Sequence, residues 1–589
     1  MALAARVKRA GERLLPPATR ARLEEERRQA AEQAAEERRQ AAEHKRLAKI
    51  AQRRQNLLDT DPTVRPVTVE DADLLGRVVD DFTAADASTH NLRLVTTALE
   101  TAGIDYFLVR GRSPLRYVVG LHRSERKRVL EAMRELYAST ALYAVKPGPQ
   151  GTTAAACAYV DGALDEEIKS GLTIRFAEPL LSPTGTILAG FEYGCDVEFW
   201  RDGATLLERD NAQEILSKLR TQTPPDVLAD SLVAPRRNKV ADVLPRAERK
   251  PATLTVAGRD YPTFEPFTWT LVDQVDFPVD VVYTWVDGDD PEHAAKRARH
   301  RGDDAATGLA ANASRFTDRD ELRYSLRSLR MYAPFVRHVY LVTDNQVPSW
   351  LDADAEGITV VDHRDIFTDH DALPTFNSHA IGTRLHHIAG LSEHYLYFND
   401  DVFLARPVGA EDFFHANGIA QLPFSPFQFG VGQPVQGEVA PNSAGKNVRA
   451  LFTEEFGRQI THKFKHTPHP QIRQVMLELE DRYAQEVERT TRSRFRALSD
   501  VGFAATMHHH YALLTGRAVP GEFRMRYVDI GAPDARQRLD QLDATDEVDF
   551  FCLNDLDTPP EAQETVNRMV REFLQARFPF PSPYEKPAE

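Results

Sequence analysis

The sequence contains few cysteines and no long apolar run. Its 589 residues include only Cys157, Cys195 and Cys552, an odd and widely spaced set that suits buried thiols better than a disulfide framework or a zinc cluster. No stretch approaches the roughly 20 apolar residues that cross a bilayer. The N-terminal sequence MALAARVKRAGERLLPP lacks an apolar core of signal-peptide length. These absences predict a cytoplasmic protein.

An overall excess of positive charge is also missing. The net charge of -15 argues against nucleic-acid binding, because such proteins neutralise phosphates with a basic surface. The first 58 residues are the exception: they carry 15 Lys and Arg against 8 Asp and Glu, a local charge of +7. The hydrophobic content of 42% is that of a globular protein, and the length predicts two or three domains.

Residues 1–66 are predicted to form a basic helical arm. EERRQAAE at 25–32 returns at 36–43 within a predicted helix over 20–58, which gives an 11-residue period. Three interpretations stay open for this helix. It could be solvated, it could pair as a coiled coil into a homo-oligomer, or it could rest its basic face on anionic lipid at the inner face of the cell membrane.

The rest of the chain divides by pattern into four parts. Residues 67–245 alternate between helical segments such as NLRLVTTALETAG and strand segments such as GCDVEFWRDG, which predicts a mixed α/β domain whose role the sequence does not reveal. Residues 246–276 are polar and rich in proline, as in a linker. Residues 277–558 are predicted to be a catalytic domain, and residues 559–589 a C-terminal helix and tail.

Strands and helices alternate from residue 277 onward. The segments VDVVYTW, HVYLVTD, GITVVDHRDIF and HYLYFNDDVFL read as strands, and their alternation with helices predicts an α/β fold with a doubly wound, mostly parallel sheet. Ligands bind beyond the carboxyl ends of the strands in such sheets. Asp287, Asp344 and Asp400 are each predicted to lie at that edge.

Two acidic clusters follow predicted strands. One crowds Asp287 with three further acids in WVDGDDPEH, and the other is Asn399, Asp400 and Asp401 in YLYFNDDVFL. Adjacent carboxylates repel one another unless a hard cation with a preference for oxygen lies between them. Transferases that use nucleotide sugars commonly hold Mg²⁺ or Mn²⁺, and through it a diphosphate, on a short acidic motif after a strand. A capped turn with solvated acids is the alternative.

Histidine and arginine are concentrated further along. HKFKHTPHPQIR and RSRFRALSD carry side chains suited to proton transfer near neutral pH and to phosphate binding; they are His462, His466, His469, Arg473, Arg492, Arg494 and Arg496. MHHHY at 507–511 could add ligands for zinc, but no cysteine accompanies it and the spacing fits no familiar ligand set. Solvated loop histidines are the remaining interpretation.

Five ordered motifs closely resemble the conserved regions of the Stealth family. They are DVVYTWVDGDDP, RDELRYSLRSLRMYAPFVRHVYLVTDNQVPSWL, TFNSHAIGTRLHHIAGLSEHYLYFNDDVFLARPV, KHTPHPQIRQVMLEL and FFCLND, between about residues 277 and 558. That family comprises bacterial capsular-polysaccharide phosphotransferases and the catalytic part of animal GlcNAc-1-phosphotransferase.

The resemblance implies a sheet like that of the nucleotide-sugar transferases and a specific reaction. A sugar 1-phosphate moves from a nucleotide sugar, of the UDP-hexose or UDP-N-acetylhexosamine type, to a hydroxyl of a glycan acceptor. A nucleoside monophosphate leaves. A conventional metal-dependent glycosyltransferase, which would release a diphosphate, and a non-catalytic carbohydrate-binding relative are the two alternatives.

Site residues carry over by position. The implied metal ligands for Mg²⁺ or Mn²⁺ are Asp287, Asp400 and Asp401, and the implied donor-binding residues are Trp285, Asp287, Gly288, Asp344, Asn377, Asn399 and, in a loose alignment, Arg449. The implied catalytic residues are Asp400 and Asp401 with His466 as general base, Arg496 on the nonbridging oxygens and Asn554 orienting the substrate. His469, His386 and the carboxylates remain alternative bases. One departure is visible, because Gly382 stands where relatives often carry an acid.

Overall fold

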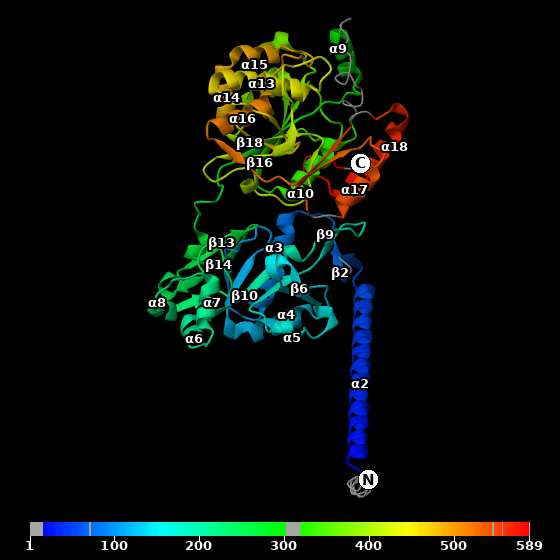
Figure 1. The fold of residues 1–589 in the computed structure, drawn as a ribbon, viewed down its shortest axis with the longest axis vertical. Helices are drawn as coiled ribbons and strands as arrows, with labels where there is room; N and C mark the ends of the chain where they lie inside the picture. The colour runs from blue at the N-terminus through cyan, green and yellow to red at the C-terminus, as the bar shows by residue number, and fades with distance from the viewer. Residues whose placement is uncertain (1–15, 70–71, 302–317, 545–546, 556–557, 588–589) are drawn as a thin grey trace.

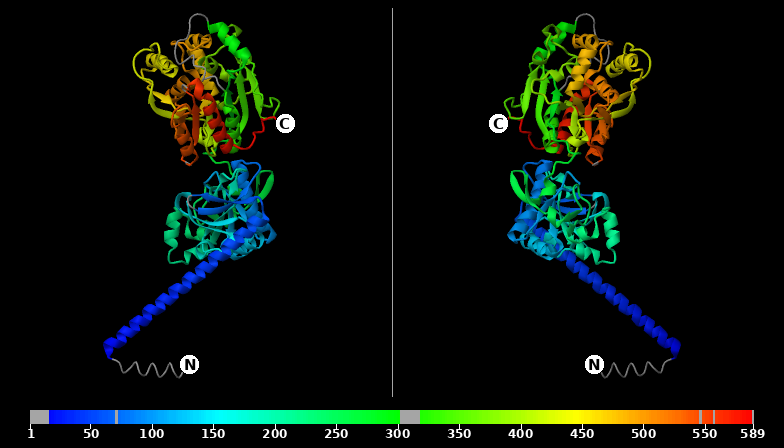
Figure 2. Two further views of the ribbon diagram at one scale, coloured as in Figure 1. Left: turned by 90° about the vertical axis from the view of Figure 1, so that its right-hand side faces the viewer. Right: turned by 90° about the vertical axis from the view of Figure 1, so that its left-hand side faces the viewer.

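The computed structural model describes residues 16–69, 72–301, 318–544, 547–555 and 558–587. These residues form a projecting helix, an N-terminal lobe (residues 61–269) and a C-terminal lobe (residues 277–587) that lies above it in Figure 1. The side views show the helix extending away from the N-terminal lobe, on the side opposite the C-terminal lobe (Figure 2).

The projecting helix α2 (Pro17–Thr60) confirms the predicted helix and extends it at both ends. Its outer surface carries ion pairs three or four residues apart; they include Arg22–Glu26, Arg28–Glu25, Arg39–Glu36 and Arg46–Glu43. Its C-terminal end is anchored on the N-terminal lobe, where Arg54 binds both carboxylate oxygens of Asp161 at 2.7 and 2.8 Å. The lipid and oligomer interpretations of this helix stay predictions.

A large mixed sheet forms the centre of the N-terminal lobe. Its strands run in the order β13 (Pro251–Val256), β14 (Arg259–Phe264), β3 (Phe107–Val109), β4 (Val118–His122), β10 (Cys195–Asp202), β7 (Thr173–Ala177), β5 (Tyr143–Pro147) and β6 (Thr153–Ala158). The helices α3 (Ala84–Thr101) and α4 (Arg126–Tyr137) contact one another and share an apolar core with this sheet. The predicted mixed α/β composition of this region is therefore observed.

The prediction of a linker over residues 246–276 is wrong for the part that contains β13 and β14. These strands pair with each other, and β14 joins β3 through Thr263 and Leu108. Tyr261 is 0% exposed because alternate residues of β14 face the core. The polar residues that suggested a linker occupy the outward positions of an edge hairpin.

The two lobes share an apolar cluster. Phe82 and Tyr193 of the N-terminal lobe belong to the same group of buried side chains as Leu322 and Leu326 of α10 (Glu321–Tyr332) in the C-terminal lobe. Arg330, at the end of α10, also donates to Asp81 at 2.6 Å. The N-terminal lobe therefore supports the helix that begins beside the candidate site described below.

The C-terminal lobe contains the predicted doubly wound sheet. Its order is β17 (Ile358–Asp362), β16 (Val336–Thr343), β15 (Val279–Thr284), β18 (His394–Asn399) and β23 (His469–Ile472), of which the first four are parallel and β23 is antiparallel. Val281, Tyr283 and Phe398 are 0% exposed, as expected for strands covered on both faces. The predicted α/β fold class is confirmed.

The direction of winding changes at β15. The chain passes from β15 to β16 and β17 on one side and returns to β18 on the other. In such a sheet a crevice opens beyond the carboxyl ends of the two strands at the switch point. Asp287 follows β15, and Asn399 ends β18, so the two predicted acidic clusters flank this crevice.

A smaller sheet brings the C-terminal segment to the same edge. It consists of β19 (Val402–Leu404), β26 (Phe550–Asn554) and β25 (Met525–Asp529), and it pairs Val402 with Cys552. The other main helices of this lobe are α9 (Pro291–Arg301), α12 (Ser378–Gly382), α13 (Ala440–Phe456), α14 (Arg473–Arg482), α15 (Ala484–Thr491), α16 (His508–Leu514), α17 (Ala535–Asp543) and α18 (Gln563–Arg577).

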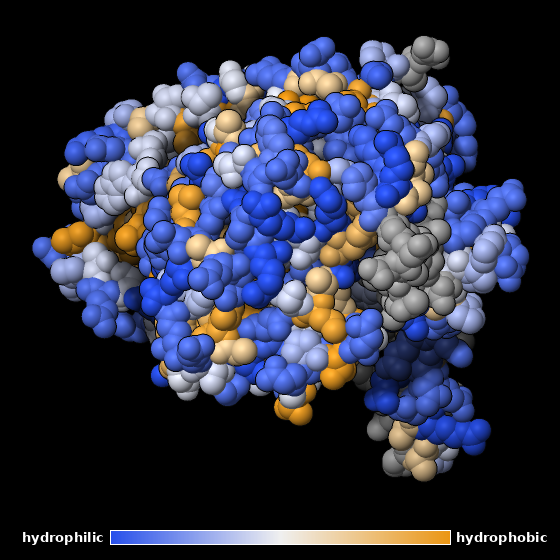
Figure 3. All heavy atoms as spheres, turned by 90° about the horizontal axis from the view of Figure 1, so that it is seen from above, coloured by the Kyte–Doolittle hydropathy of each residue, from blue (hydrophilic) through white to orange (hydrophobic). Residues whose placement is uncertain are grey.

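Among the residues that the structure describes, no helix is both long enough and apolar enough to cross a bilayer. The face of the molecule seen from above is mainly hydrophilic, with apolar side chains in scattered patches (Figure 3).

The C-terminal tail packs on α10 through a buried carboxylate. Glu585, whose side chain is 1% exposed, accepts hydrogen bonds from Arg327 at 2.7 Å and from the backbone of Ser582 at 2.8 Å. Arg323 also donates to it. Although burial would raise it, these donors lower the pKa of Glu585. Its contribution to stability is therefore present at neutral pH and is lost as the pH falls through that lowered value.

We expect Glu585→Ala to lower the free energy of unfolding by about 3 kcal/mol, because it leaves the buried Arg327 guanidinium without its counter-charge. Urea unfolding at pH 7 measures the change. Glu572→Ala removes an exposed carboxylate from α18 and should behave like the parent chain. Equal stability of the two variants would contradict the role given to Glu585.

Candidate functional site

Asp401 lies at the centre of the residues that the structure brings together. Its Oδ1 is 3.0 Å from Nε2 of His466, and its Oδ2 accepts from Nδ2 of Asn554 at 3.0 Å and from the thiol of Cys552 at 3.4 Å. The backbone N–H of Leu553 donates to its carbonyl oxygen at 3.0 Å. Three residues predicted from separate motifs, Asp401, His466 and Asn554, therefore form one contact group.

Cys552 is a member of this group that the sequence analysis read only as a buried thiol. It was missed because a lone cysteine in an apolar strand carries no positional signal. The pairing of β19 with β26 places it beside Asp401. Burial and the adjacent carboxylate raise the pKa of Cys552 well above its usual value, so its thiol keeps its proton and donates it to Asp401.

Asp401 and His466 stabilise each other's charged forms. Burial opposes ionisation of both groups, yet the imidazole lowers the pKa of Asp401 and the carboxylate raises the pKa of His466. Asn399 adds a contact from Nδ2 to Nε2 of His466 at 3.0 Å. Because Nε2 is held by Asp401 and Asn399, Nδ1 is the ring nitrogen left to exchange a proton with a substrate. An imidazole oriented by a carboxylate can act as a general base.

Asp400 belongs to a second group, made of carboxylates. Burial, the neighbouring Asp401 and the acids Glu321 and Asp318 together raise the pKa of Asp400 well above its usual value. Burial is also the main cause that raises the pKa of Glu321 to about 7 and that of Asp318 to about 6. Asp287 contributes to the shift at Asp318, so Asp318 connects the two predicted acidic clusters.

These carboxylates fit a hard divalent cation. Several oxygen ligands with raised pKa values meet at the carboxyl edge of the sheet, which is the donor set that Mg²⁺ and Mn²⁺ prefer. Both oxygens of Asp401 are engaged by protein donors, so Asp400 is the better placed of the two to meet a cation. The metal role of Asp401 stays a prediction.

Asp318 and Glu321 were missed by the sequence analysis. Glu321 lies within the RDELRYSLRS motif and Asp318 just before it, but three acids ahead of a helix are ordinary first-turn residues. The signal that separates them is burial, since Glu321 is 7% exposed. Burial depends on the packing of α10 against β19, which the sequence does not display.

The turn after β15 is held by Gln346. Its side chain accepts from the N–H of Asp287 at 3.1 Å, and its Nε2 donates to the Asp287 carbonyl at 3.0 Å and to Asp290 at 2.9 Å. Gly288 lies in this turn. Trp285 is 7% exposed, and its indole Nε1 has no hydrogen-bond partner among the described residues. The predicted turn is therefore a fixed structure beside the carboxylates.

Asp344 lies at the end of the neighbouring strand β16 and faces α9. Its carboxylate is 3.6 Å from Nζ of Lys296. Burial lowers the pKa of His363 to about 4, and Asp344 acts on that imidazole in the opposite direction. Asp344 thus belongs to a group with Lys296 and His363, and its contact with a donor stays a prediction.

Arg496 lies near the carboxylates, and Asn377 positions its loop. Burial raises the pKa of Tyr397, and the charges of Asp400 and Arg496 act on that phenol in opposite directions. Arg496 donates to the hydroxyl of Ser378 at 2.8 Å. Asn377 is 0% exposed and donates to Asp500 at 2.8 Å. The amide of Asn377 is thus committed inside the protein, and its predicted contact with the donor is not what the structure shows.

Arg449 is also used internally. It lies on α13 and donates to the carbonyl oxygens of Gly430 at 2.7 Å and Gly432 at 3.1 Å. Its guanidinium stacks 5.3 Å above the ring of Phe429. These contacts hold a loop in place. They give no support to the predicted donor contact.

The glycine that departs from the family pattern has a packing reason. A Cβ at Gly382 would lie 3.3 Å from the Cβ of Ala504, so α12 packs there against the turn that precedes α16. An acid at this position would need that contact to open.

A further cluster explains one of the alternative bases. His386 and His387 each place Nε2 at 2.7 Å from Oε2 of Glu480, and Arg384 binds the other oxygen of the same carboxylate. Within the described part of the chain, this cluster and the Asp401–His466–Cys552 group are the two sets of three side chains with spacing that suits a metal. His386 therefore belongs to a cluster away from Asp401.

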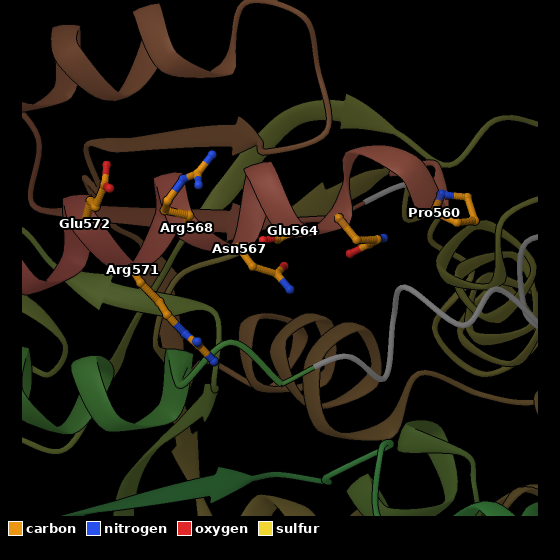
Figure 4. Close-up of a pocket in the computed structure, with 7 residues that line it drawn as sticks. Pro560, Glu564, Asn567, Arg568, Arg571 and Glu572 are labelled. Atoms are coloured by element: carbon orange, nitrogen blue, oxygen red, sulfur yellow. The ribbon is translucent and has the colours of Figure 1, made fainter.

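A groove of about 540 Å³ runs along α18 and is lined by Pro560, Gln563, Glu564, Asn567, Arg568, Arg571 and Glu572. Asn567 and Arg571 point to one side of the helix and Arg568 and Glu572 to the other (Figure 4). Asn567 and Gln563 accept hydrogen bonds from the buried Arg319 at 2.6 and 3.0 Å. The groove is therefore part of the wall that holds the start of α10 in place.

We expect Asn377→Asp to lower both stability and activity. The substitution places a second carboxylate 2.8 Å from Asp500 in a buried site, where like charges repel, and it removes the donor that ties the Arg496 loop to α12. Thermal unfolding measures the loss. Adding Asp500→Asn exchanges acceptor and donor and should restore part of it; no recovery in the double variant would contradict this contact.

Four family models match the C-terminal lobe. They are described as Stealth protein conserved regions 1, 2, 3 and 4 and match residues 277–304, 315–422, 465–513 and 540–589. The last match continues through α18 and the tail. The predicted limit of the catalytic domain at residue 558 is therefore earlier than the end of the matched region.

Curated relatives extend the similarity to the N-terminal lobe. Exopolysaccharide phosphotransferase SCO2592 of Streptomyces coelicolor is 40% identical over 87% of this chain, which spans 52% of that protein. Exopolysaccharide phosphotransferase SCO6023 of the same organism is 39% identical over 92% of this chain and 87% of its own length. A crystal structure of mouse xyloside xylosyltransferase 1 aligns at 10% identity with a TM-score of 0.24, over 48% of this chain and 100% of that one. From the ordered motifs, the four matched regions and these relatives, we conclude that the chain belongs to the Stealth family.

Proposed function

We propose that this chain transfers a sugar 1-phosphate from a nucleotide sugar to a hydroxyl of a glycan acceptor, in the synthesis of an exopolysaccharide or capsule. The observation that carries the proposal is the Asp401–His466 pair beside the buried carboxylates around Asp400. One group can accept a proton, and the other can hold a cation that neutralises a diphosphate. Relatives named exopolysaccharide phosphotransferases support the choice of a phosphoryl group as cargo.

The carboxylate group would receive the donor. Asp400, with Asp318 and Asp287, would hold Mg²⁺ or Mn²⁺, which when bound neutralises charge on the donor diphosphate. Arg496, from the opposite side of Tyr397's surroundings, would bind nonbridging oxygens of the phosphate that moves. Asn554 orients Asp401 through its amide, so its effect on the substrate is indirect.

The histidine would activate the acceptor. As the acceptor hydroxyl attacks the phosphorus that bears the sugar, Nδ1 of His466 takes its proton, and Asp401 stabilises the imidazolium that results. The bond from this phosphorus to the bridging oxygen breaks, and the electron pair leaves with the nucleoside monophosphate. The sugar keeps its bond to the transferred phosphate throughout, so its anomeric configuration is retained.

The released nucleotide tests this reaction. A panel of nucleotide sugars is incubated with the protein, Mg²⁺ and a glycan acceptor, and the products are separated by chromatography. We expect a nucleoside monophosphate in amounts equal to the transferred sugar phosphate. We expect EDTA to abolish its release, and Asp400→Asn to lower turnover by at least about 10²-fold, since charge neutralisation dominates phosphoryl transfer. Release of a nucleoside diphosphate would instead indicate a conventional glycosyltransferase.

A pH profile tests the base. His466→Ala should lower kcat by roughly 10² to 10⁴, the usual range for a lost general base. Because the base must be unprotonated, kcat should rise with pH through the pKa of His466. Asp401 raises that pKa, so Asp401→Asn should lower the plateau of kcat and move the acid limb to lower pH. An acid limb that stays in place would show that another group is the base.

A further inference from the structure

Three buried histidines form a continuous chain of hydrogen bonds behind the candidate site. Nδ1 of His469, on β23, lies 3.0 Å from Nε2 of His509 on α16. Nδ1 of His509 lies 3.0 Å from Nδ1 of His508. The chain ends at a peptide group, because the backbone N–H of Ile472 donates to Nε2 of His508 at 2.9 Å.

The peptide group fixes the proton positions along the whole chain. A backbone N–H can only donate, so Nε2 of His508 accepts and its proton must lie on Nδ1. That proton is donated to Nδ1 of His509, which places the proton of His509 on Nε2. This second proton is donated to Nδ1 of His469. The ring of His469 is therefore held as the tautomer with its proton on Nε2.

The surroundings keep these rings neutral. Burial lowers the pKa of His469 and of His508 to about 3 and moves that of His509 in the same direction. The occupied nitrogens also argue against the zinc interpretation of MHHHY, since Nε2 of His508 already accepts from a peptide N–H. A metal ligand needs that electron pair free.

His469 lies on the site side of this chain. It pairs across the sheet with Tyr397, whose phenol responds to the charges of Asp400, Arg496 and Asp401. The charge of His466, three residues earlier, also acts on His469. The ring of His469 is partly exposed, whereas His508 and His509 are 0% exposed. Since Nδ1 is turned inward to His509, the Nε2 edge is the one available to a ligand.

We propose that His469 is a neutral hydrogen-bond donor to a phosphate oxygen of the substrate, and that His509 and His508 are positioning residues that fix its tautomer. The inference rests on the proposed function for the identity of the oxygen. An imidazole with a fixed proton on Nε2 can donate to developing negative charge without any rearrangement. It cannot compete with His466 as a base, because its other nitrogen is already occupied. His469 is thus assigned to donation and not to proton abstraction.

Kinetics of matched variants test the donor. His469→Ala should lower kcat by about 10²-fold with little change in KM, the usual cost of one lost donor to a charged oxygen. His469→Gln should recover at least about tenfold of that loss, because its amide carries N–H near the position of the imidazole Nε2. His469→Asn, whose amide lies near the position of Nδ1, should not. Equal losses for the glutamine and alanine variants, or no loss for alanine, would overturn the assignment.

A second pair of variants tests the positioning residues. His509→Gln keeps an N–H that can donate to His469, whereas His509→Met has similar bulk and cannot. We expect the methionine variant to have a several-fold lower kcat than the glutamine variant at equal thermal stability. If the two variants have the same kcat, the tautomer of His469 does not matter for the reaction.

Nitrogen NMR tests the tautomer without reference to any reaction. In the parent chain labelled with ¹⁵N-histidine, the signal lost in His469→Gln should show a protonated Nε2 and an unprotonated Nδ1, unchanged between pH 5 and 8. In His509→Met it should show exchange between tautomers or titration. A proton on Nδ1 in the parent chain would overturn the inference. Failure to release a nucleoside monophosphate would overturn the proposed function and leave the NMR result standing.

Discussion

The Asp401 carboxylate joins segments that are far apart in the sequence. It lies between β18 and β19, receives His466 from the segment before β23, and receives Cys552 and Asn554 from β26. A buried carboxylate with fewer donors would take up a proton, and the imidazole would then lose the charge that orients it. Two sheets are therefore held in register by the same contacts that prepare a base, so stability and chemistry depend on one side chain.

The sequence predicts the features that depend on local pattern. Apolar runs locate the parallel strands, and the acids at their ends mark the crevice, because the direction of a parallel strand sets which end carries ligands. Contacts made by amide and guanidinium groups follow a different rule. Asn377 and Arg449 are polar residues in or near matched motifs, yet their hydrogen bonds go to backbone and buried partners. A motif alone does not tell whether a polar side chain faces a ligand or the protein.

The parts that could not be predicted share a dependence on long-range packing. Glu321 becomes a high-pKa carboxylate only because α10 packs against β19, and Cys552 meets Asp401 only through the pairing of β26. The hairpin β13–β14 looked like a linker because each strand is an edge strand with polar residues on one side. The N-terminal lobe is covered by the relatives, which align over 92% of the chain in one case, and it packs directly on the helix that carries Glu321.

The antiparallel direction of β23 has a consequence for how such a chain can diverge. Because β23 runs against its neighbours, the residues before it, rather than those after it, lie at the ligand-bearing edge. His466 therefore reaches the site from the amino end of one strand and Asp400 from the carboxyl end of the next. The ladder between β18 and β23 alone sets their separation. The segment of chain between these strands can change in length or surface without moving the base relative to the carboxylates, so recognition of different acceptors can evolve there while the chemistry stays in register.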